Sequence, residues 1–386
     1  MRHTGAMAEI AAVNQFMKKS APCAIAPDES GWTARSSRVG LHLLFSFAVA
    51  FTLVLSAFSQ NQSPAPTYSS PLEQAEKLLR ENKPQDALGL LNQTVKENPK
   101  LAGLERMIGK AYLQTRQYSE AIAHLGTALQ QDNNDLEASE LLALSFYGSG
   151  NCHDALPLLE KLKPHFSNES PDSPYLLSIC YLMTQQWEKA RKALAEMFSV
   201  SPDSGMAYLA LGKLLVRQHM VEAAVPQIET ALRLEPRLAM AHFLLGEIDL
   251  YQSNTQAAVG EFQKELAVNP TLWLVYWRLG DAYIRLENYN DAEKVLKEAI
   301  WLNEASPDAY VLLGKIAMKK NDAVLASQFL ERALSLAPQN FDAHEALAGA
   351  YQKLGRAADA NRQMELAKRL RGEKPPPEKE LLQSVP

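Results

Sequence analysis

An alanine recurs along this chain at an almost constant interval of 34 residues, and no other feature of the sequence restricts the possible folds so strongly. Nine alanines occupy this register, with one extra residue inserted between the third and the fourth: Ala87, Ala121, Ala155, Ala190, Ala224, Ala258, Ala292, Ala326 and Ala360. A period of this length is typical of stacked helix pairs, each of which contacts only its neighbours. The sequence therefore predicts about nine repeats over residues 68–372, with no room for a separate domain.

Several repeats carry a glycine where a helix is expected. In the segment YWRLGDAYIRLENYNDAEKVLKEAI, residues 276–300, Gly280 stands inside the first apolar stripe. Glycine in a helix interior costs roughly 1 kcal/mol relative to alanine, so its recurrence needs a reason. Equivalent glycines follow the same period at Gly212, Gly246 and Gly314. We interpret them as points of close helix crossing, where the glycine of the first helix meets the alanine of the second.

Prolines and cap residues predict the ends of the helices. Ser306 followed by Pro307 predicts a cap residue and then the first helical residue. Asn290 or Asp291 is predicted to cap the second helix of its repeat. Five second helices are followed by a proline, which cannot continue a helix: Pro99, Pro202, Pro236, Pro270 and Pro338.

These positions resemble the tetratricopeptide-repeat family. The family pattern is matched most fully at Leu279, Gly280, Tyr283, Ala292, Leu296 and Ala299. The resemblance covers roughly 300 residues, and it implies an all-α fold, a right-handed α-α solenoid of about nine 34-residue helix-turn-helix repeats.

Some copies depart from the family pattern. Ala143, Ser178 and Ala348 replace the glycine, and Asp249 stands where a tyrosine is usual. A buried carboxylate would need a partner. We therefore expect Asp249 to lie at a hydrated edge of the helix interface.

An uncharged segment precedes the repeats. Residues 40–58 contain no Asp, Glu, Lys or Arg, and their length is close to the roughly 20 residues that span a bilayer. Basic residues precede this segment and none follows before Lys77, which predicts repeats outside the cytoplasm. Residues 40–58 are then either the h-region of a signal peptide cleaved before Gln60 or a retained transmembrane anchor. A cytoplasmic protein with a misassigned upstream sequence is the third alternative.

The same reasoning divides the rest of the chain. Residues 1–39 form a basic leader, in which Met17 is a candidate for the true start, and residues 59–67 form a linker. The solenoid is predicted over 68–372, and a disordered tail rich in proline and charge over 373–386. A short leader starting at Met17 would look bacterial, so we expect an exported or inner-membrane-anchored protein with periplasmic repeats.

The net charge does not indicate nucleic-acid binding, and the sequence motifs do not indicate catalysis. A formal net charge of −5 gives no basic signature for nucleic acid. The chain has no Gly-rich phosphate loop, no HExxH and no GxSxG, and its histidines are scattered. We therefore predict no enzyme activity, no cofactor, no metal and no small-molecule substrate.

The cysteines allow two interpretations. Cys152 lies beside His153, but no orienting group for a nucleophile is nearby. Cys152 and Cys180 lie in neighbouring repeats and could form a disulfide in an exported chain.

The resemblance also implies where a ligand would bind, because in this family the first helices line a concave groove. The corresponding positions here are apolar and aromatic with isolated charges of both signs, as at protein interfaces. They are Tyr147, Tyr175, Ile179, Leu182, Leu209, Lys213, Phe243, Glu247, Leu250, Trp277, Asp281, Ile284, Lys315 and Met318. Lys110, Leu144 and Lys213 stand where the family's carboxylate clamp would need asparagine, so that clamp is not supported.

The function implied is a non-catalytic scaffold that binds a peptide or a helical segment of a partner protein in the groove. Packing within the solenoid and self-association are alternative roles for the same stripe, and the oligomeric state is left open. A second hypothesis is a regulatory or assembly subunit of an envelope enzyme or secretion complex, for example a glycosyltransferase partner, with catalysis in another chain.

Overall fold

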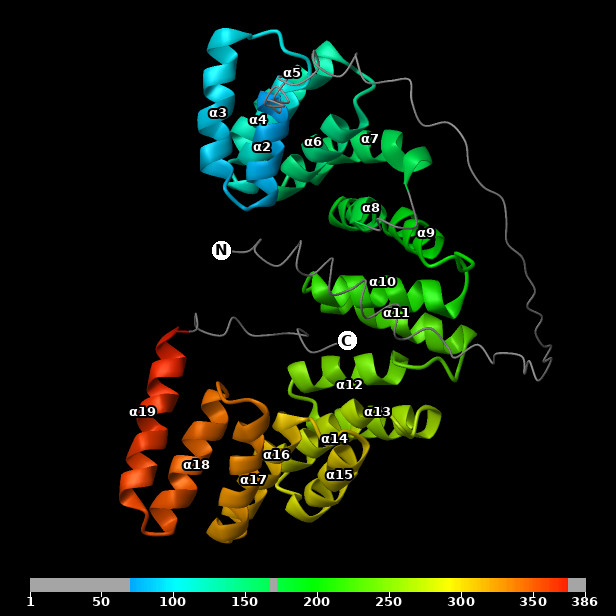
Figure 1. Cartoon of the computed structure of the whole chain (residues 1–386). Coiled ribbons are helices and arrows are strands. Elements are labelled where there is room, and N and C mark those ends of the chain that lie inside the picture. Colours follow the sequence, from blue (N-terminus) through cyan, green and yellow to red (C-terminus); the bar gives the residue numbers. More distant parts are fainter. Residues whose placement is uncertain (1–69, 167–171, 374–386) are drawn as a thin grey trace, which may run out of the picture. The chain divides into compact units, whose positions relative to one another are not determined.

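The computed structural model describes residues 70–166 and 172–373, and all regular structure within them is helical. It consists of eighteen α-helices and one short 3-10 helix, Lys163–His165. The all-α repeat fold expected from the sequence is therefore confirmed (Figure 1). The leader, residues 40–58 and the linker lie outside the described residues, as does all but the first residue of the predicted tail.

The chain divides into two compact units, residues 1–151 and 152–386. In the first unit, each helix packs against the next in sequence. The first helices of its repeats are α2 (Pro71–Arg80), α4 (Leu104–Gln114) and α6 (Leu136–Gly148), and the second helices are α3 (Pro84–Glu97) and α5 (Tyr118–Gln131).

The second unit continues the alternation from α7 (Cys152–Leu162). Its first helices are α8 (Asp172–Met183), α10 (Gly205–Arg217), α12 (Ala241–Tyr251), α14 (Trp273–Arg285), α16 (Pro307–Lys319) and α18 (Phe341–Lys353). Its second helices are α9 (Trp187–Met197), α11 (Val221–Leu234), α13 (Thr255–Val268), α15 (Tyr289–Leu302), α17 (Ala323–Leu336) and α19 (Ala357–Glu373).

The glycines of the first helices recur because a side chain at their positions would overlap the second helix. A Cβ built on Gly280 would lie 2.5 Å from Cγ of Leu296 and 2.6 Å from its Cδ2, which is a steric overlap. The same overlap would arise between Gly246 and Phe262, and between Gly314 and Leu330. The expectation that the glycine meets the alanine of the second helix is therefore only partly correct, since Gly212 approaches the Ala224 carbonyl but lies closer to Ile228. The glycine makes room for the large apolar residue four positions after that alanine.

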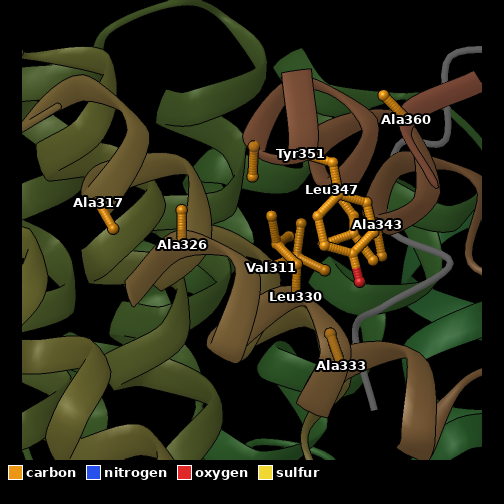
Figure 2. Packing of buried hydrophobic residues seen from close by; sticks show 10 residues of the cluster. Val311, Ala317, Ala326, Leu330, Ala333, Ala343, Leu347, Tyr351 and Ala360 are labelled. Atoms are coloured by element: carbon orange, nitrogen blue, oxygen red, sulfur yellow. The ribbon is translucent and has the colours of Figure 1, made fainter. Parts of the chain in front are cut away.

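Figure 2 shows this packing in the last two repeats. Leu330 of α17, the side chain that lies over Gly314, sits beside Val311 of α16. Leu347 and Tyr351 of α18 close the cluster from the next repeat. Each unit contains clusters of buried apolar residues of this kind, as expected when each repeat buries apolar surface against its neighbours.

All nine turns from a first helix to a second helix share one backbone conformation. Each contains a residue with positive φ, and only two of the nine are glycine. The residue after it donates its N–H to the carbonyl five residues earlier, at 2.8 or 2.9 Å, as Asn288 does to Tyr283. This bond is that of a Schellman-type helix end. Asp249 supplies the same carbonyl to Asn254, so the loss of a tyrosine at this position leaves the turn unchanged. Its side chain is half-buried, in agreement with a hydrated edge.

The predicted helix ends are partly correct. Ser306 is the N-cap of α16 with Pro307 at its first position, although the Ser306 hydroxyl makes no capping bond. The proline lies two residues beyond the end of α3, α11, α13 and α17, but five beyond the end of α9. The cap expected at Asn290 or Asp291 was wrong. Asn288 caps α15, because the left-handed residue before it ends the turn and the helix starts earlier.

We expect the replacement Asn288→Ala to lower the free energy of unfolding by about 1 kcal/mol, the usual cost of losing an N-cap side chain. Asn288 Oδ1 accepts from the N–H of Asp291, and alanine removes that acceptor. Asn290→Ala is the matched control, since Asn290 lies after the cap and contacts only Lys320. Urea unfolding of both variants checks this. A larger loss for Asn290→Ala would restore the original assignment of the cap.

Within residues 70–166 and 172–373, no helix is long and apolar enough to cross a membrane. The predicted export or anchor segment, residues 40–58, lies outside these residues.

Candidate functional site

Half of the predicted binding stripe is part of the core. Seven of its fourteen residues are buried: Tyr175, Ile179, Leu182, Leu209, Phe243, Glu247 and Leu250. Phe243 and Leu182 are 0% exposed, and the Phe243 ring packs against Phe262 at a centroid distance of 5.8 Å. Neither side chain reaches the surface in this structure, so their exposure gives the predicted binding role no support.

Helix α8 accounts for three of the buried positions. Its residues from Tyr175 to Leu182 are all buried, because the helix is apolar on every side. A stripe chosen by repeat position therefore has no solvent-facing counterpart on α8.

The remaining seven predicted residues keep solvent-accessible surface. Lys315 is exposed, and the others are half-buried: Tyr147, Lys213, Trp277, Asp281, Ile284 and Met318. Five of them lie on the neighbouring first helices α14 and α16: Trp277, Asp281, Ile284, Lys315 and Met318. These two helices are the best candidates for a binding face in the second unit.

A charged cluster lies across this face. Nη2 of Arg278 on α14 donates to Oε2 of Glu247 on α12 at 2.6 Å. Asp308 at the start of α16 also lies within the electrostatic reach of Arg278. The Arg278 guanidinium therefore attracts one acidic residue of the preceding repeat and one of the following repeat. We call Glu247, Trp277, Arg278 and Asp308 the Arg278 cluster.

Trp277 completes the cluster. The guanidinium carbon of Arg278 lies 4.4 Å from the centroid of the Trp277 ring, in the range of a cation–π contact. Among the described residues, neither Trp277 Nε1 nor Glu247 Oε1 has a hydrogen-bond partner, although both atoms are buried. An unpaired buried polar group costs about 1–3 kcal/mol, so these atoms mark an arrangement that packing alone does not explain.

The two acidic residues differ in exposure, since Glu247 is buried and Asp308 is exposed. Desolvation raises the pKa of Glu247, and the charge and hydrogen bond of Arg278 oppose it. Desolvation also raises the pKa of Asp308, again against the attraction of Arg278, but solvent screens an exposed carboxyl and its effect on stability is small. A carboxyl with a raised folded-state pKa contributes stability below its unfolded pKa, and this contribution is lost as the pH rises through the folded value. The ionised form of Glu247 is therefore destabilising, and a further donor or cation would relieve it.

Lys213 on α10 is the other half-buried charge of the predicted stripe. Burial, with Arg217 as the second cause, lowers its pKa from 10.5 to about 8. A base with a lowered folded-state pKa destabilises the fold while it is charged, and the stability it costs returns as the pH rises from about 8 to 10.5.

We expect the replacement Lys213→Met to be more stable than the wild type at pH 7, with a difference that shrinks as the pH rises from 8 to 10.5. Methionine keeps most of the apolar stem and removes the charge. Urea unfolding across this pH range measures the difference. Lys315→Met is the control, since Lys315 is exposed. A constant difference for Lys213→Met would contradict the prediction.

The first unit has a polar network of its own on its first helices. Arg106 of α4 contacts Asp135 at 2.7 Å, and Lys110 lies 3.1 Å from Glu76 and 2.9 Å from Glu137. Desolvation lowers the pKa of Lys110, but the hydrogen bonds to Glu137 and Glu76 outweigh it and the net pKa is raised. Lys110 is thus committed to acidic residues of its own chain.

Arg278 is the residue that sequence reasoning missed. It lies next to Trp277, outside the positions that the family pattern assigns to the groove. The sequence does contain a signal for Arg278. Glu247 and Asp281 occupy the same position in successive repeats, and Arg278 precedes Asp281 by less than one helical turn, so a basic residue lies close to this recurring acidic position.

In the described part of the chain, Cys152 and His153 have different partners. The His153 side chain is 90% exposed and lies 3.3 Å from Asp154. Cys152 is buried against Cys180 instead. Among the described residues, no group of three or more His, Cys, Asp or Glu side chains has the arrangement of a metal site.

Models of known protein families match several parts of the chain. Two models described as tetratricopeptide repeat match residues 78–144 and residues 209–271 with 278–341. The chain belongs to the tetratricopeptide-repeat (TPR) proteins. A further model, described as anaphase-promoting complex, cyclosome, subunit 3, matches residues 116–197. No curated protein sequence gives a significant match.

Solved structures of other TPR-like proteins resemble parts of the chain. MamA is 21% identical over 42% of this chain and 95% of its own, with a TM-score of 0.39. YrrB, described as a TPR protein with an unusual peptide-binding site, is 19% identical over 48% of this chain and 94% of its own, with a TM-score of 0.41. Pseudomonas aeruginosa PilF is 19% identical over 54% of this chain and 94% of its own, with a TM-score of 0.44. At these scores the likeness identifies neither a ligand nor a partner for this chain.

TPR repeats are generally non-catalytic scaffolds that bind other proteins or peptides. The fold of this chain therefore supports a role in protein–protein interaction. The exposed part of the predicted stripe on α14 and α16, together with the Arg278 cluster, is the candidate binding site.

Proposed function

We propose that this TPR protein is an exported or membrane-tethered scaffold that binds a peptide or helical segment of a partner protein. The proposed binding face consists of the exposed side chains of α14 and α16 and of the Arg278 cluster between α12 and α16. The observation that carries the proposal is the Arg278 cluster itself. It places a guanidinium, one buried and one exposed carboxylate and an indole on three successive first helices.

The chemistry of the cluster matches a polypeptide. A polypeptide offers charged and aromatic or aliphatic side chains, and the cluster presents the half-buried Trp277 ring and Arg278 guanidinium and the exposed Asp308 carboxylate. Ile284 and Met318 are half-buried apolar side chains that would hold apolar side chains of the ligand. Acidic and basic residues occur in equal number among Glu247, Asp281, Asp308, Arg278, Arg285 and Lys315. The proposed ligand is therefore a mixed-charge segment with apolar anchors rather than a strongly acidic or basic one.

Site-specific photocrosslinking in the native cell tests the proposal. A photoreactive residue at Trp277, Ile284 or Met318 should capture a partner, whereas the same residue at Gln328, exposed on α17, should not. A synthetic peptide spanning the captured segment should then bind the purified full chain. Capture of a catalytic chain would favour the alternative role as a regulatory or assembly subunit.

Truncation of two tryptophans separates the binding face from the rest of the surface. We expect Trp277→Ala to weaken peptide binding by about tenfold or more, as truncated aromatic anchors do. Trp301→Ala is the matched control, since Trp301 is 76% exposed on the second helix α15. Equal effects of the two substitutions, or equal capture from Gln328, would contradict the proposed face.

The export part of the proposal has a separate test. The uncharged run at 40–58, the basic residues before it and the small residues before Gln60 support export or anchoring. N-terminal sequencing of the protein isolated from its cell should find a start at Gln60 if the segment is cleaved. An uncleaved chain in the membrane fraction would support the anchor, and an uncleaved chain outside it would contradict both.

A further inference from the structure

Two thiols from neighbouring repeats meet inside the second unit. Cys152 is the first residue of α7, and Cys180 lies in the middle of α8. Their sulfur atoms are 3.0 Å apart, with the Cys180 thiol donating to Cys152. Cys152 is 7% exposed and Cys180 is 0% exposed. A disulfide has its sulfur atoms about 2 Å apart, so the two need to approach each other by only about 1 Å.

We propose that Cys152 and Cys180 form an intramolecular disulfide that fastens helix α7 to helix α8. The inference is independent of partner binding. It concerns an oxidation site whose two sulfurs are already brought together by the packing of these helices.

The environment assigns a different role to each cysteine. The hydrogen bond from Cys180 lowers the pKa of Cys152. The position of Cys152 at a helix N-terminus also favours a thiolate there. The same contact, together with burial, raises the pKa of Cys180. Cys152 is therefore the attacking sulfur, and Cys180 is the sulfur that closes the bond.

The reaction needs a disulfide oxidant, such as glutathione disulfide or an exposed disulfide of an oxidising protein. The Cys152 thiolate attacks one sulfur of the oxidant, and the first thiolate leaves with one electron pair. Cys180 then loses its proton and attacks Cys152 Sγ, which releases the second thiolate of the oxidant. The two cysteines lose two electrons and two protons in total, and the oxidant leaves as two thiols.

A cross-link between these residues closes a loop and adds a covalent bond between two helices that already share packing contacts and the hydrogen bond from the Tyr181 hydroxyl to Glu160. Disulfides stabilise mainly by reducing the freedom of the unfolded chain. Such a bond would persist in an oxidising compartment, where structural disulfides are common, and would be absent in a reducing one.

The test uses the full chain with Cys23→Ser, so that only the two cysteines of interest remain. After incubation with millimolar glutathione disulfide and alkylation of free thiols, we expect a peptide map to show the Cys152 and Cys180 peptides joined. The oxidised protein should melt about 5–10 °C above the reduced one, and dithiothreitol should reverse the change.

Single substitutions test the order of attack. With Cys180→Ser, Cys152 should stop at a mixed disulfide with glutathione. With Cys152→Ser, Cys180 should remain unmodified in the folded protein because it is fully buried. Two results with unsubstituted Cys152 and Cys180 would overturn the proposal: both thiols still alkylated after oxidation, or a mixed disulfide at Cys152 that never closes. Neither result depends on the folding of the serine variants.

Discussion

Replacement of Arg278 by alanine should lower the free energy of unfolding by about 3–5 kcal/mol, the largest effect we expect from any single substitution on the binding face. Nη2 of Arg278 lies 2.6 Å from Oε2 of Glu247, and the Glu247 side chain is only 4% exposed. Removal of the guanidinium leaves that buried carboxylate without its hydrogen-bonded countercharge, and only the weaker attraction of Arg285 remains. Asp308 also loses the attraction of Arg278, but Asp308 is exposed and Lys315 still attracts it, so most of the loss comes from Glu247. Chemical unfolding of the full chain measures the loss.

The control for this substitution lies on the same helix. Arg285 pairs with Asp281 at 2.9 Å, but the Arg285 side chain is 48% exposed. Arg285→Ala should therefore cost less than about 1 kcal/mol, as for other exposed ion pairs. The double variant Glu247→Met with Arg278→Met should recover most of the loss, because apolar residues can replace a buried ion pair. Equal losses for Arg278→Ala and Arg285→Ala would show that burial does not govern the cluster.

The second large effect is expected at Gly280. Gly280→Ala should lower the free energy of unfolding by about 2 kcal/mol, although alanine is the better helix former. The added Cβ would overlap Cγ and Cδ2 of Leu296, and Cγ is a branch point that cannot turn away as a side-chain end can. Either α14 and α15 move apart or Leu296 leaves its rotamer, and both disturb a side chain that is 0% exposed.

Gly260 provides the matched control. It lies inside α13, and a Cβ built on it would meet no atom within 4 Å. Gly260→Ala should therefore stabilise the protein by up to about 1 kcal/mol, so that the same substitution changes sign between two helices. The double variant Gly280→Ala with Leu296→Ala should lose less than the sum of the single losses, since the new methyl group fills part of the cavity. Strict additivity would mean that the two residues are not in contact.

The repeat register of the fold was predictable from the sequence because it is set by the sizes of the side chains where two helices meet. The alanines at Ala224, Ala258, Ala292, Ala326 and their equivalents all lie on second helices, and the position of the glycines follows from the large residue that each one faces. The cap at Asn288 was not predictable in this way. The turn before it is closed by backbone atoms, which leave no mark in the side chains.

The binding face could be predicted only in part, because exposure depends on what each helix packs against. Trp277, Ile284 and Lys315 keep accessible surface. Phe243, which occupies the same repeat position as Trp277, is fully buried. Arg278 was missed for a different reason. Its partners come from the repeats before and after its own, and such a contact depends on the reach of a side chain rather than on its place in the pattern.

The nine left-handed turns have a consequence for how such a chain can be redesigned. Seven of them use a residue other than glycine, and all nine are closed by the same main-chain hydrogen bond. The path of each turn therefore depends on the main chain more than on one type of side chain at the left-handed position. We expect that a whole repeat can be inserted or deleted by design while the turn conformation is kept.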